Sequence, residues 1–274
     1  MISCKLCPRQ CGVDRVNVRG VCRMGPEAVV ARAAPHFGEE PCISGEKGSG
    51  TVFFAGCTLR CVFCQNYELS RGRAGRAVSA AELADIFRRL EDQGVHNLNL
   101  VSGTQFVPAI LEALERAKPA VPVVWNSSGY ETAETVRALS QYVHVFLPDM
   151  KYALSAPAHR YSYAGDYPAR AKKAIETMAE CTGPYELDEN GLLKKGVLIR
   201  HLVLPGQVEN TRRVIRWVSE TFLPGEVLFS LMAQYTPCGE LEKTDITDGF
   251  VQELTAAGEE MIPAFDGTGV TVDG

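Results

Sequence analysis

From residue 51 onward, short runs of apolar residues alternate with longer stretches in which apolar residues recur every three or four positions. Short runs rich in β-branched and aromatic residues are typical of buried strands, and the longer spacing is typical of helices with one buried face. The pattern predicts strands at residues 51–55, 97–101, 121–125, 143–147, 197–204 and 226–232. It predicts helices between them at residues 80–93, 107–117, 133–142, 169–180 and 211–221.

This alternation predicts an α/β fold built on a parallel sheet. A helix that connects two parallel strands packs back onto the twisted sheet through a right-handed crossover. Six such units are too few to close an eight-stranded barrel, so we expect an open, partial (β/α)6 barrel of the TIM type. In barrels of this kind the active site lies in the loops that follow the strands. Polar clusters at those positions are therefore candidate site residues.

The first 50 residues differ from the rest of the chain. They are rich in cysteine, arginine, glycine and proline, and they lack a sustained apolar period. So short a segment buries little apolar surface by itself and usually needs a metal or disulfides to fold. We therefore expect a small cysteine-rich, metal-binding lobe at residues 1–50, and a main domain with a C-terminal extension at residues 51–274.

Length, charge and hydrophobicity argue against a nucleic-acid-binding protein and against a membrane protein. The 274 residues carry a net charge of −5, which argues against general nucleic-acid binding because such domains usually present a basic face. The start of the chain has no apolar run of the signal-peptide kind, and the most apolar segments are too short to span a bilayer. The expected location is the cytoplasm, without a membrane partner.

Ten cysteines are many for a chain in a reducing compartment, where closely spaced thiols bind metals more often than they form disulfides. Cys57, Cys61 and Cys64 follow the first predicted strand with the spacing C-x3-C-x2-C. Three thiolates can hold three irons of a [4Fe–4S] cubane and leave the fourth iron open to an exchangeable chelating molecule. A zinc site would need a further ligand, and the nearest histidines, His36 and His96, lie outside this loop.

A second group of cysteines, Cys4, Cys7, Cys11 and Cys22, has the spacing C-x2-C-x3-C-x10-C. Four thiolates on short loops can bind a zinc ion or a second iron–sulfur cluster. The residue types do not distinguish these two metals, and Cys42 is a further candidate ligand close by in the sequence. A zinc ion would be structural, whereas a cluster could relay electrons.

The cluster loop and the segments that follow the later strands resemble the radical S-adenosylmethionine superfamily, and within it the pyruvate formate-lyase activating enzymes. The loop reads Cys-x3-Cys-x-aromatic-Cys directly after the first strand, with Phe63 before the third cysteine. The segments with this likeness run through nearly the whole chain, at residues 61–67 (CVFCQNY), 99–104 (NLVSGT), 125–130 (WNSSGY), 147–152 (LPDMKY), 200–206 (RHLVLPG) and 232–237 (MAQYTP).

The resemblance implies a reaction. S-adenosylmethionine would chelate the open iron, and one electron from the reduced cluster would yield methionine and a 5′-deoxyadenosyl radical that abstracts a substrate hydrogen. A glycine of a glycyl radical enzyme is the target that the subgroup implies, although activating enzymes commonly carry extra cysteines after the radical motif rather than before it. Attack on a small molecule or a peptide side chain is the alternative. An iron–sulfur electron-transfer protein is the alternative from another class.

The resemblance also assigns cofactor-binding roles to polar residues after the strands. They are Asn66, Ser102, Gly103, Thr104, Asn126, Ser127, Ser128, Asp149, Lys151 and Arg200. Residues 102–104 stand where many members have a glycine-rich motif ending in glutamate, and the glutamate is absent here. Asp149 and Lys151 alternate on an extended segment and should point to one face. Arg200 lies in an apolar strand, where a charge needs a partner or a polar cavity.

Three arginines, Arg71, Arg73 and Arg76, follow the cluster loop. A charge run of this kind is ordinarily solvated surface. Its alternative role is to dock an acidic flavodoxin or ferredoxin that delivers the electron.

Overall fold

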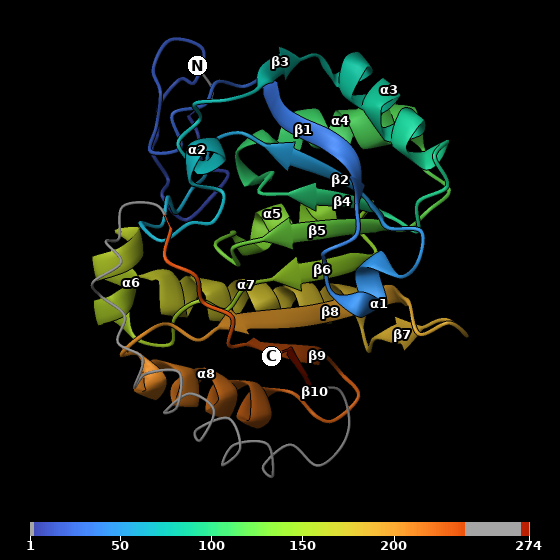
Figure 1. Ribbon diagram of the computed structural model, residues 1–274. Coiled ribbons are helices and arrows are strands. Elements are labelled where there is room, and N and C mark those ends of the chain that lie inside the picture. The colour runs from blue at the N-terminus through green and yellow to red at the C-terminus, as the bar shows by residue number, and fades with distance from the viewer. Residues whose placement is uncertain (1–2, 239–269, 274) are drawn as a thin grey trace.

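The computed structural model describes residues 3–238 and 270–273. Its centre is a ten-stranded sheet, in which neighbouring strands follow the order β10-β9-β8-β6-β5-β4-β2-β1-β3 (Figure 1). A short strand, β7 (Glu186–Leu187), pairs with β8 beside this path. Among the described strands, the two at the ends of the order do not pair with each other. The sheet is therefore open, and the predicted partial barrel is confirmed.

The parallel part of the sheet contains every strand that the sequence predicts. These strands are β2 (Ser49–Phe54), β4 (Leu98–Val101), β5 (Val123–Ser127), β6 (Val145–Pro148), β8 (Leu193–Leu202) and β9 (Leu228–Met232). Each pairs in parallel with the next in that order. A further parallel strand, β10 (Val270–Asp273), lies beside β9 and extends the sheet beyond the six predicted strands.

Part of the N-terminal segment joins the same sheet, which the sequence pattern does not predict. Strand β1 (Ala28–His36) pairs antiparallel with β2 along most of its length and with β3 (Arg76–Val78) on its other side. The segment is rich in alanine and has little strand preference of its own, so pairing with a neighbour on each side forms it. The division at residue 50 stays a prediction, and the four N-terminal cysteines all precede β1.

The five predicted helices are present, and α4, α5 and α7 lie behind the sheet in Figure 1. They are α3 (Ala80–Glu91), α4 (Val107–Ala117), α5 (Ala133–Leu139), α7 (Tyr167–Thr182) and α8 (Val208–Thr221). Helix α3 begins with a capping box in which Ser79 and Glu82 exchange hydrogen bonds. Short helices are added at α1 (Pro41–Ser44), α2 (Tyr67–Ser70), η1 (Thr104–Phe106) and α6 (Ser155–Ser162). None of the helices in the described ranges has the length and apolar character needed to cross a membrane.

The main hydrophobic core lies between the sheet and its helices. Alternation along the strands sends Leu98, Leu100 and Trp125 into this core. Their neighbours Asn99 and Asn126 point to the opposite, concave face of the sheet, where both contact the same carboxylate. The concave face therefore carries the polar side chains of the strands.

Helix α1 closes part of the concave face. Its Ile43 is fully buried in a second, smaller apolar cluster with Val124 of β5, Val145 of β6 and Leu198 of β8. In Figure 1 this helix lies in front of the sheet, on the side away from α4, α5 and α7. The segment just before α1 is thereby brought next to the polar side chains of β4, β5 and β8.

Candidate active site

The three cysteines Cys57, Cys61 and Cys64 lie in the loop between β2 and α2. The loop turns at Gly56, whose φ of 77° belongs to the left-handed region that favours glycine. A Cβ atom at this position would also clash with the side chain of Met24. The glycine that precedes the first cysteine is therefore needed for both the turn and the packing of the N-terminal segment against it.

Gln105 and Arg9 fix this loop from two sides, and no sequence motif marks either residue. The Nε2 of Gln105 donates to the carbonyl groups of Ala55 (3.0 Å) and Ser102 (2.8 Å), which links the cluster loop to the loop after β4. Arg9 donates from Nε to the carbonyl of Thr58 (3.0 Å) and from Nη2 to the carbonyl of the last residue of α6 (2.9 Å). The N-terminal segment is therefore bound directly to the cluster loop.

Helix α6 supports the loop from a third side. The amide of Val62 donates to the carbonyl of Tyr161 (2.9 Å), and the hydroxyl of Ser162 donates to the sulfur of Cys61 (2.9 Å). The ring of Phe63 meets the ring of Tyr161 edge-on, with 6.2 Å between the centroids. The sequence did not predict α6 because its eight residues, SAPAHRYS, contain a proline and no helical period of large apolar residues.

The donor set fits an iron–sulfur cubane. Burial raises the pKa of Cys61, and burial together with the two neighbouring thiols raises the pKa of Cys64 to about 12, so both keep a proton until a metal displaces it. The serine hydroxyl at Cys61 is placed for a sulfur that accepts a hydrogen bond, as a thiolate does. In residues 3–238 and 270–273, no three His, Cys, Asp or Glu side chains converge on one metal-ion position. A cubane needs no such convergence, since each thiolate binds a different iron.

Asp149 and Lys151, in the segment after β6, point to one face as predicted and form an ion pair of 2.6 Å. Burial alone would lower the pKa of Lys151, but the Asp149 carboxylate and the nearby Cys61 raise it above its ordinary range. The hydroxyl of Tyr167 holds the segment by accepting from the amide of Lys151 (2.9 Å) and donating to the carbonyl of Asp149 (2.6 Å). The Lys151 ammonium is thus fixed beside the cluster loop.

Arg200 of β8 is paired on all sides of its guanidinium group. Nε donates to Asp149 (3.1 Å), Nη1 to Glu39 (2.5 Å) and Nη2 to the side-chain oxygen of Asn126 (2.8 Å). The side chains of Arg200 and Glu39 are only 12% and 13% exposed, so these charges are largely shielded from water. The expectation that a charge in this apolar strand must be paired is confirmed. A contact between Arg200 and the cofactor stays a prediction.

Glu39 is the member of this group that sequence reasoning missed. Its carboxylate also accepts from the side-chain amides of Asn126 (2.7 Å) and Asn99 (3.3 Å), so it joins strands β4, β5 and β8. The need of Arg200 for an acidic partner was the available signal. That signal could not select Glu39, which lies 161 positions away and outside every recognised motif.

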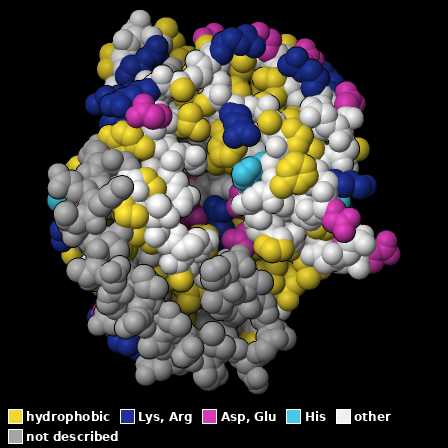
Figure 2. Space-filling view, viewed as in Figure 1, with side chains coloured by type: hydrophobic (Ala, Val, Ile, Leu, Met, Phe, Trp, Pro, Cys, Tyr) yellow, Lys and Arg dark blue, Asp and Glu magenta, His cyan; other side chains and the backbone are white. Residues whose placement is uncertain are grey.

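Glu39, Asp149, Lys151 and Arg200 form what we call the charged cluster. Figure 2 shows a hollow in the surface, with basic and acidic side chains inside it. The hollow lies on the face of the sheet opposite α4, α5 and α7. The charged cluster contains two acids and two bases. A ligand on this face therefore meets no net charge from these four groups.

Thr104 and Ser127, two of the predicted cofactor residues, turn their hydroxyl groups to the buried Glu131. Thr104 donates to one carboxylate oxygen (2.7 Å) and Ser127 to the other (3.1 Å). The turn after β5 thus supplies a carboxylate beside the loop 102–104, which lacks a glutamate of its own. Ser127 shares the helix-facing side of β5 with Trp125. Direct cofactor contacts by these two hydroxyls stay a prediction.

The other predicted cofactor residues have distinct settings. A Cβ atom at Gly103 would lie 2.7 Å from Cδ1 of Ile110, so core packing requires glycine there. Ser102 takes the left-handed conformation with φ of 58°. Asn66 is exposed just before α2. The carbonyl oxygen of Ser128 lies 2.8 Å from the hydroxyl of Tyr167, which it shares with the carbonyl of Asp149. Their assignments also stay predictions.

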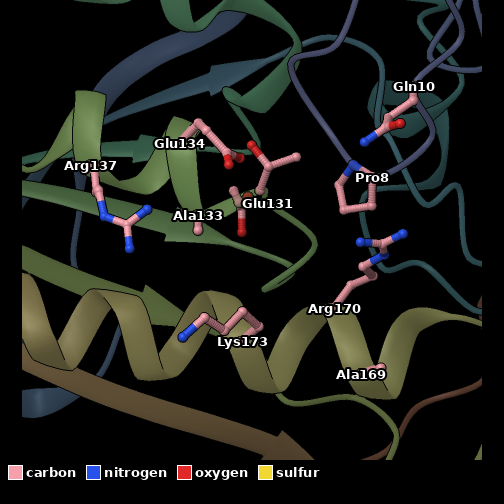
Figure 3. Close-up of a pocket in the computed structure, with 10 residues that line it drawn as sticks. Pro8, Gln10, Glu131, Ala133, Glu134, Arg137, Ala169, Arg170 and Lys173 are labelled. Carbon is pink, nitrogen blue, oxygen red and sulfur yellow. The ribbon is translucent and has the colours of Figure 1, made fainter.

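A cavity of about 500 Å³ lies beside Glu131 on the helix side of the sheet (Figure 3). Its lining comes from three parts of the chain, including Pro8 of the N-terminal segment, Arg137 of α5 and Lys173 of α7. Glu131 itself is 1% exposed, and this burial raises its pKa to about 7. The cavity lies on the side of the sheet opposite the charged cluster.

The raised pKa of Glu131 should make stability depend on pH. Between about pH 4.5 and pH 7 the folded protein keeps the proton that the unfolded chain has lost, so this group lowers the free energy of unfolding as pH rises. Glu131→Gln should therefore become more stable relative to the native protein from about pH 5 to about pH 8, measured by urea unfolding. Glu134→Gln is the control, because the pKa of exposed Glu134 is lowered, its titration falls below pH 4.5, and the relative stability of this variant should not change between pH 5 and pH 8. A pH-independent difference for Glu131→Gln would contradict the prediction.

Cys4, Cys7, Cys11 and Cys22 all line one small cavity of about 20 Å³, which Thr58 of the cluster loop also lines. Within the described residues, however, no three of these thiols converge on a single metal-ion position. Burial raises the pKa of Cys7 to about 12 and also raises that of Cys22. The segment that carries these cysteines therefore lies against the cluster loop, and both the second metal site and its metal stay predictions.

The three arginines after the cluster loop all contact their own chain. Arg73 and Arg76 form exposed ion pairs, with Glu68 at 3.0 Å and with Glu82 at 2.9 Å. Arg71 donates to a backbone carbonyl of the cluster loop (2.8 Å). An acidic electron donor would have to compete with the two glutamates for this patch, and docking there stays a prediction.

Two sequence relatives cover different shares of this chain. Uncharacterized protein MJ0674 of Methanocaldococcus jannaschii is 30% identical over 247 residues, which cover 86% of this chain and 66% of that protein. The 7-carboxy-7-deazaguanine synthase of Methanothermobacter thermautotrophicus is 32% identical over 104 residues, which cover 37% of this chain and 41% of the synthase. The chain thus spans less than two thirds of the length of either relative.

Solved structures and a family model complete the comparison. SuiB of Streptococcus suis, solved with S-adenosylmethionine and with its precursor peptide SuiA, has a TM-score of 0.52 in both states at 16% identity. The match covers 80% of this chain and 48% or 46% of SuiB, and it shows a shared fold. The model of the Radical SAM superfamily matches residues 51–218, more than half of the chain. This chain therefore belongs to the Radical SAM superfamily.

Proposed function

We propose that this radical S-adenosylmethionine enzyme abstracts a hydrogen atom from a polypeptide substrate. One observation supports the proposal most. Cys61, after β2, accepts from Ser162 (2.9 Å), whose oxygen lies 2.7 Å from the phenol of Tyr152 in the segment after β6. Residues from two separate strands therefore meet at one rim of the barrel, which is where a cofactor that spans the rim would bind.

The superfamily uses a [4Fe–4S] cluster and S-adenosylmethionine. Cys57, Cys61 and Cys64 would hold three irons and leave the fourth for the amino and carboxylate groups of the cofactor. When bound, the cluster and cofactor supply methionine and a 5′-deoxyadenosyl radical by transfer of one electron to the sulfonium. Lys151, held at 2.6 Å from Asp149, presents a positive charge that can orient a carboxylate at this rim.

In the proposed step, a hydrogen atom would move from a substrate C–H bond to the 5′ carbon of the bound cofactor. This would give 5′-deoxyadenosine and leave the unpaired electron on the substrate. A flavodoxin or ferredoxin of low potential supplies the electron for each cycle. The chain's own contribution is to hold the reacting carbon near the radical and to keep water and other hydrogen donors away.

The shape of the concave face supports a polypeptide substrate. The hollow in Figure 2 opens to the surface on the side of the sheet that no helix of the α4, α5 and α7 layer covers. SuiB, which shares the fold, binds a precursor peptide. The resemblance to pyruvate formate-lyase activating enzymes makes a backbone glycine of a partner enzyme the first target to test.

A small molecule is the second candidate substrate. The sequence match to a 7-carboxy-7-deazaguanine synthase over 104 residues favours it. The balanced charges of the charged cluster would then suit a neutral or zwitterionic molecule with several hydrogen-bonding groups.

Deuterium tracing separates the two candidates. The anaerobically reconstituted enzyme receives S-adenosylmethionine, reduced flavodoxin and extract from deuterated cells, divided by dialysis into macromolecules and small molecules. We expect deuterium in 5′-deoxyadenosine with the macromolecules, including macromolecules labelled only at the glycine α-carbon. Transfer confined to the small-molecule fraction would overturn the polypeptide proposal. The Cys61→Ala variant, run in parallel, reports any cleavage that does not depend on the cluster.

A further inference from the structure

A chain of two buried hydroxyl groups ends on one sulfur of the cluster loop. The hydroxyl of Ser162, the last residue of α6, donates to the sulfur of Cys61 at 2.9 Å. The phenol of Tyr152, in the segment after β6, lies 2.7 Å from the same serine oxygen. Ser162 and Tyr152 are fully buried and Cys61 is 6% exposed, so water does not compete for these bonds.

The direction of the hydrogen bonds follows from the state of the sulfur. A cysteine that ligates iron is a thiolate, which has no proton and can only accept. The single hydroxyl hydrogen of Ser162 is then donated to Cys61, and the serine oxygen can only accept a further hydrogen bond. Tyr152 is therefore the donor to Ser162, although the distance alone would allow either direction. Two aligned donors in a row polarise each other and strengthen the bond to the sulfur.

We propose that Ser162, supported by Tyr152, raises the reduction potential of the cluster held by Cys57, Cys61 and Cys64. This inference rests on the proposed function, because it concerns the cluster that starts the reaction. The electron that reduces the cluster adds negative charge to the irons and their sulfur ligands. A donor aimed at a ligand sulfur stabilises the reduced state more than the oxidised state, and hydrogen bonds to sulfur are a recognised control of cluster potential.

Ser162 and Tyr152 act on Cys61, the one of the three ligands that is buried. Cys64 has a separate hydroxyl partner in Ser70, so each of these two sulfurs has its own serine. Cys61 is buried, and without Ser162 its sulfur would lose this donor in a medium of low dielectric. Lys151 adds positive charge to the same region but does not depend on Ser162, since its ion-pair partner is Asp149. The hydroxyl chain and the ammonium therefore act on the cluster independently.

A purely structural role for Ser162 is the competing explanation. The contacts that join α6 to the cluster loop include two that do not use the serine hydroxyl. They are the bond from the Val62 amide to the Tyr161 carbonyl and the bond from Arg9 to the backbone carbonyl of Ser162. Ser162→Ala keeps both, so it removes the donor while the loop stays attached.

The test is the midpoint potential of the reconstituted cluster, measured by redox titration with electron paramagnetic resonance and without substrate. Ser162→Ala should hold a full cluster and, at fixed solution potential, show a reduced-to-oxidised ratio about tenfold lower, a shift of about 59 mV to more negative potential. Tyr152→Phe should shift the potential in the same direction by less, because Ser162 still donates. Ser140→Ala should leave the potential unchanged, because the half-buried Ser140 donates only to the carbonyl of Arg137 in its own helix α5.

The outcomes separate this inference from the proposed function. Loaded Ser162→Ala and Tyr152→Phe proteins with the native potential would overturn the inference and leave the enzyme assignment intact. If Ser162→Ala does not retain its cluster, Tyr152→Phe decides, because it leaves the serine contact in place. A native protein that assembles no cluster, or cleaves no S-adenosylmethionine when reduced, would instead contradict the proposed function.

Discussion

Replacing Cys57, Cys61 and Cys64 together by alanine is expected to remove about four iron atoms per chain and all formation of 5′-deoxyadenosine. The loop has no substitute ligands, because residues 55–66 contain no histidine, aspartate or glutamate. The measurements are iron, zinc and sulfide content after anaerobic reconstitution, together with chromatography of the reaction products. Product formation at the native rate by the triple variant would contradict the cluster assignment.

The same variant reports on the N-terminal lobe. Any metal that remains after the loop has lost its thiolates belongs to the group of Cys4, Cys7, Cys11 and Cys22, so residual zinc indicates a structural site and residual iron with sulfide indicates a second cluster. Cys181→Ala is the control. Cys181 is exposed on α7 and belongs to neither cysteine group, so this variant should keep the full metal content and activity.

Replacing Glu39 by alanine is expected to lower the free energy of unfolding by about 3 to 5 kcal/mol, the usual cost of breaking a buried ion pair from one side. The change leaves Arg200 without one of its two carboxylates and removes the acceptor for the side-chain amides of Asn126 and Asn99. Glu39→Gln should cost less, since it keeps an acceptor oxygen. Urea unfolding of the reconstituted protein under anaerobic conditions measures the difference.

An exposed ion pair supplies the matched control for Glu39. Glu68 and Arg73 are 62% and 61% exposed, so Glu68→Ala should change the free energy of unfolding by no more than about 1 kcal/mol. The comparison tests burial, since both variants remove one carboxylate from an arginine. Equal effects of Glu39→Ala and Glu68→Ala would show that the charged cluster does not stabilise the barrel.

The parallel strands and their helices could be predicted from sequence because each has a recognisable pattern within its own residues. The run 51–55 is mostly apolar because strand β2 is buried on both faces. Helix α3 shows its apolar period and its capping residues within a few positions of the sequence. Strand β1 and helix α6 could not be predicted in this way. Strand β1 forms because it pairs with β2 and β3. Helix α6 is short and has little helical periodicity.

The residues of the candidate site likewise fall into those with a local sequence pattern and those whose role depends on distant contacts. The cysteine spacing and the alternation of Asp149 and Lys151 are local patterns, and the structure gives them a common setting at one rim. Glu39, Gln105 and Ser162 act through contacts with parts of the chain far away in sequence. A carboxylate, an amide or a hydroxyl group is an ordinary surface residue until the fold decides its neighbours, so no local signal marks these three.

The contact between Glu39 and Arg200 has a consequence for the order in which a new chain is completed. A ribosome releases Glu39 161 residues before Arg200, whereas β1 and β2 are neighbours in the sequence and can pair early. Contacts between distant residues form slowly. Until α6 and β8 have emerged, the cysteine loop lacks the cover of Ser162 and the concave face lacks Arg200. The concave face and the cover of the cysteine loop are therefore completed only late in synthesis, after the first strands of the sheet can already have paired.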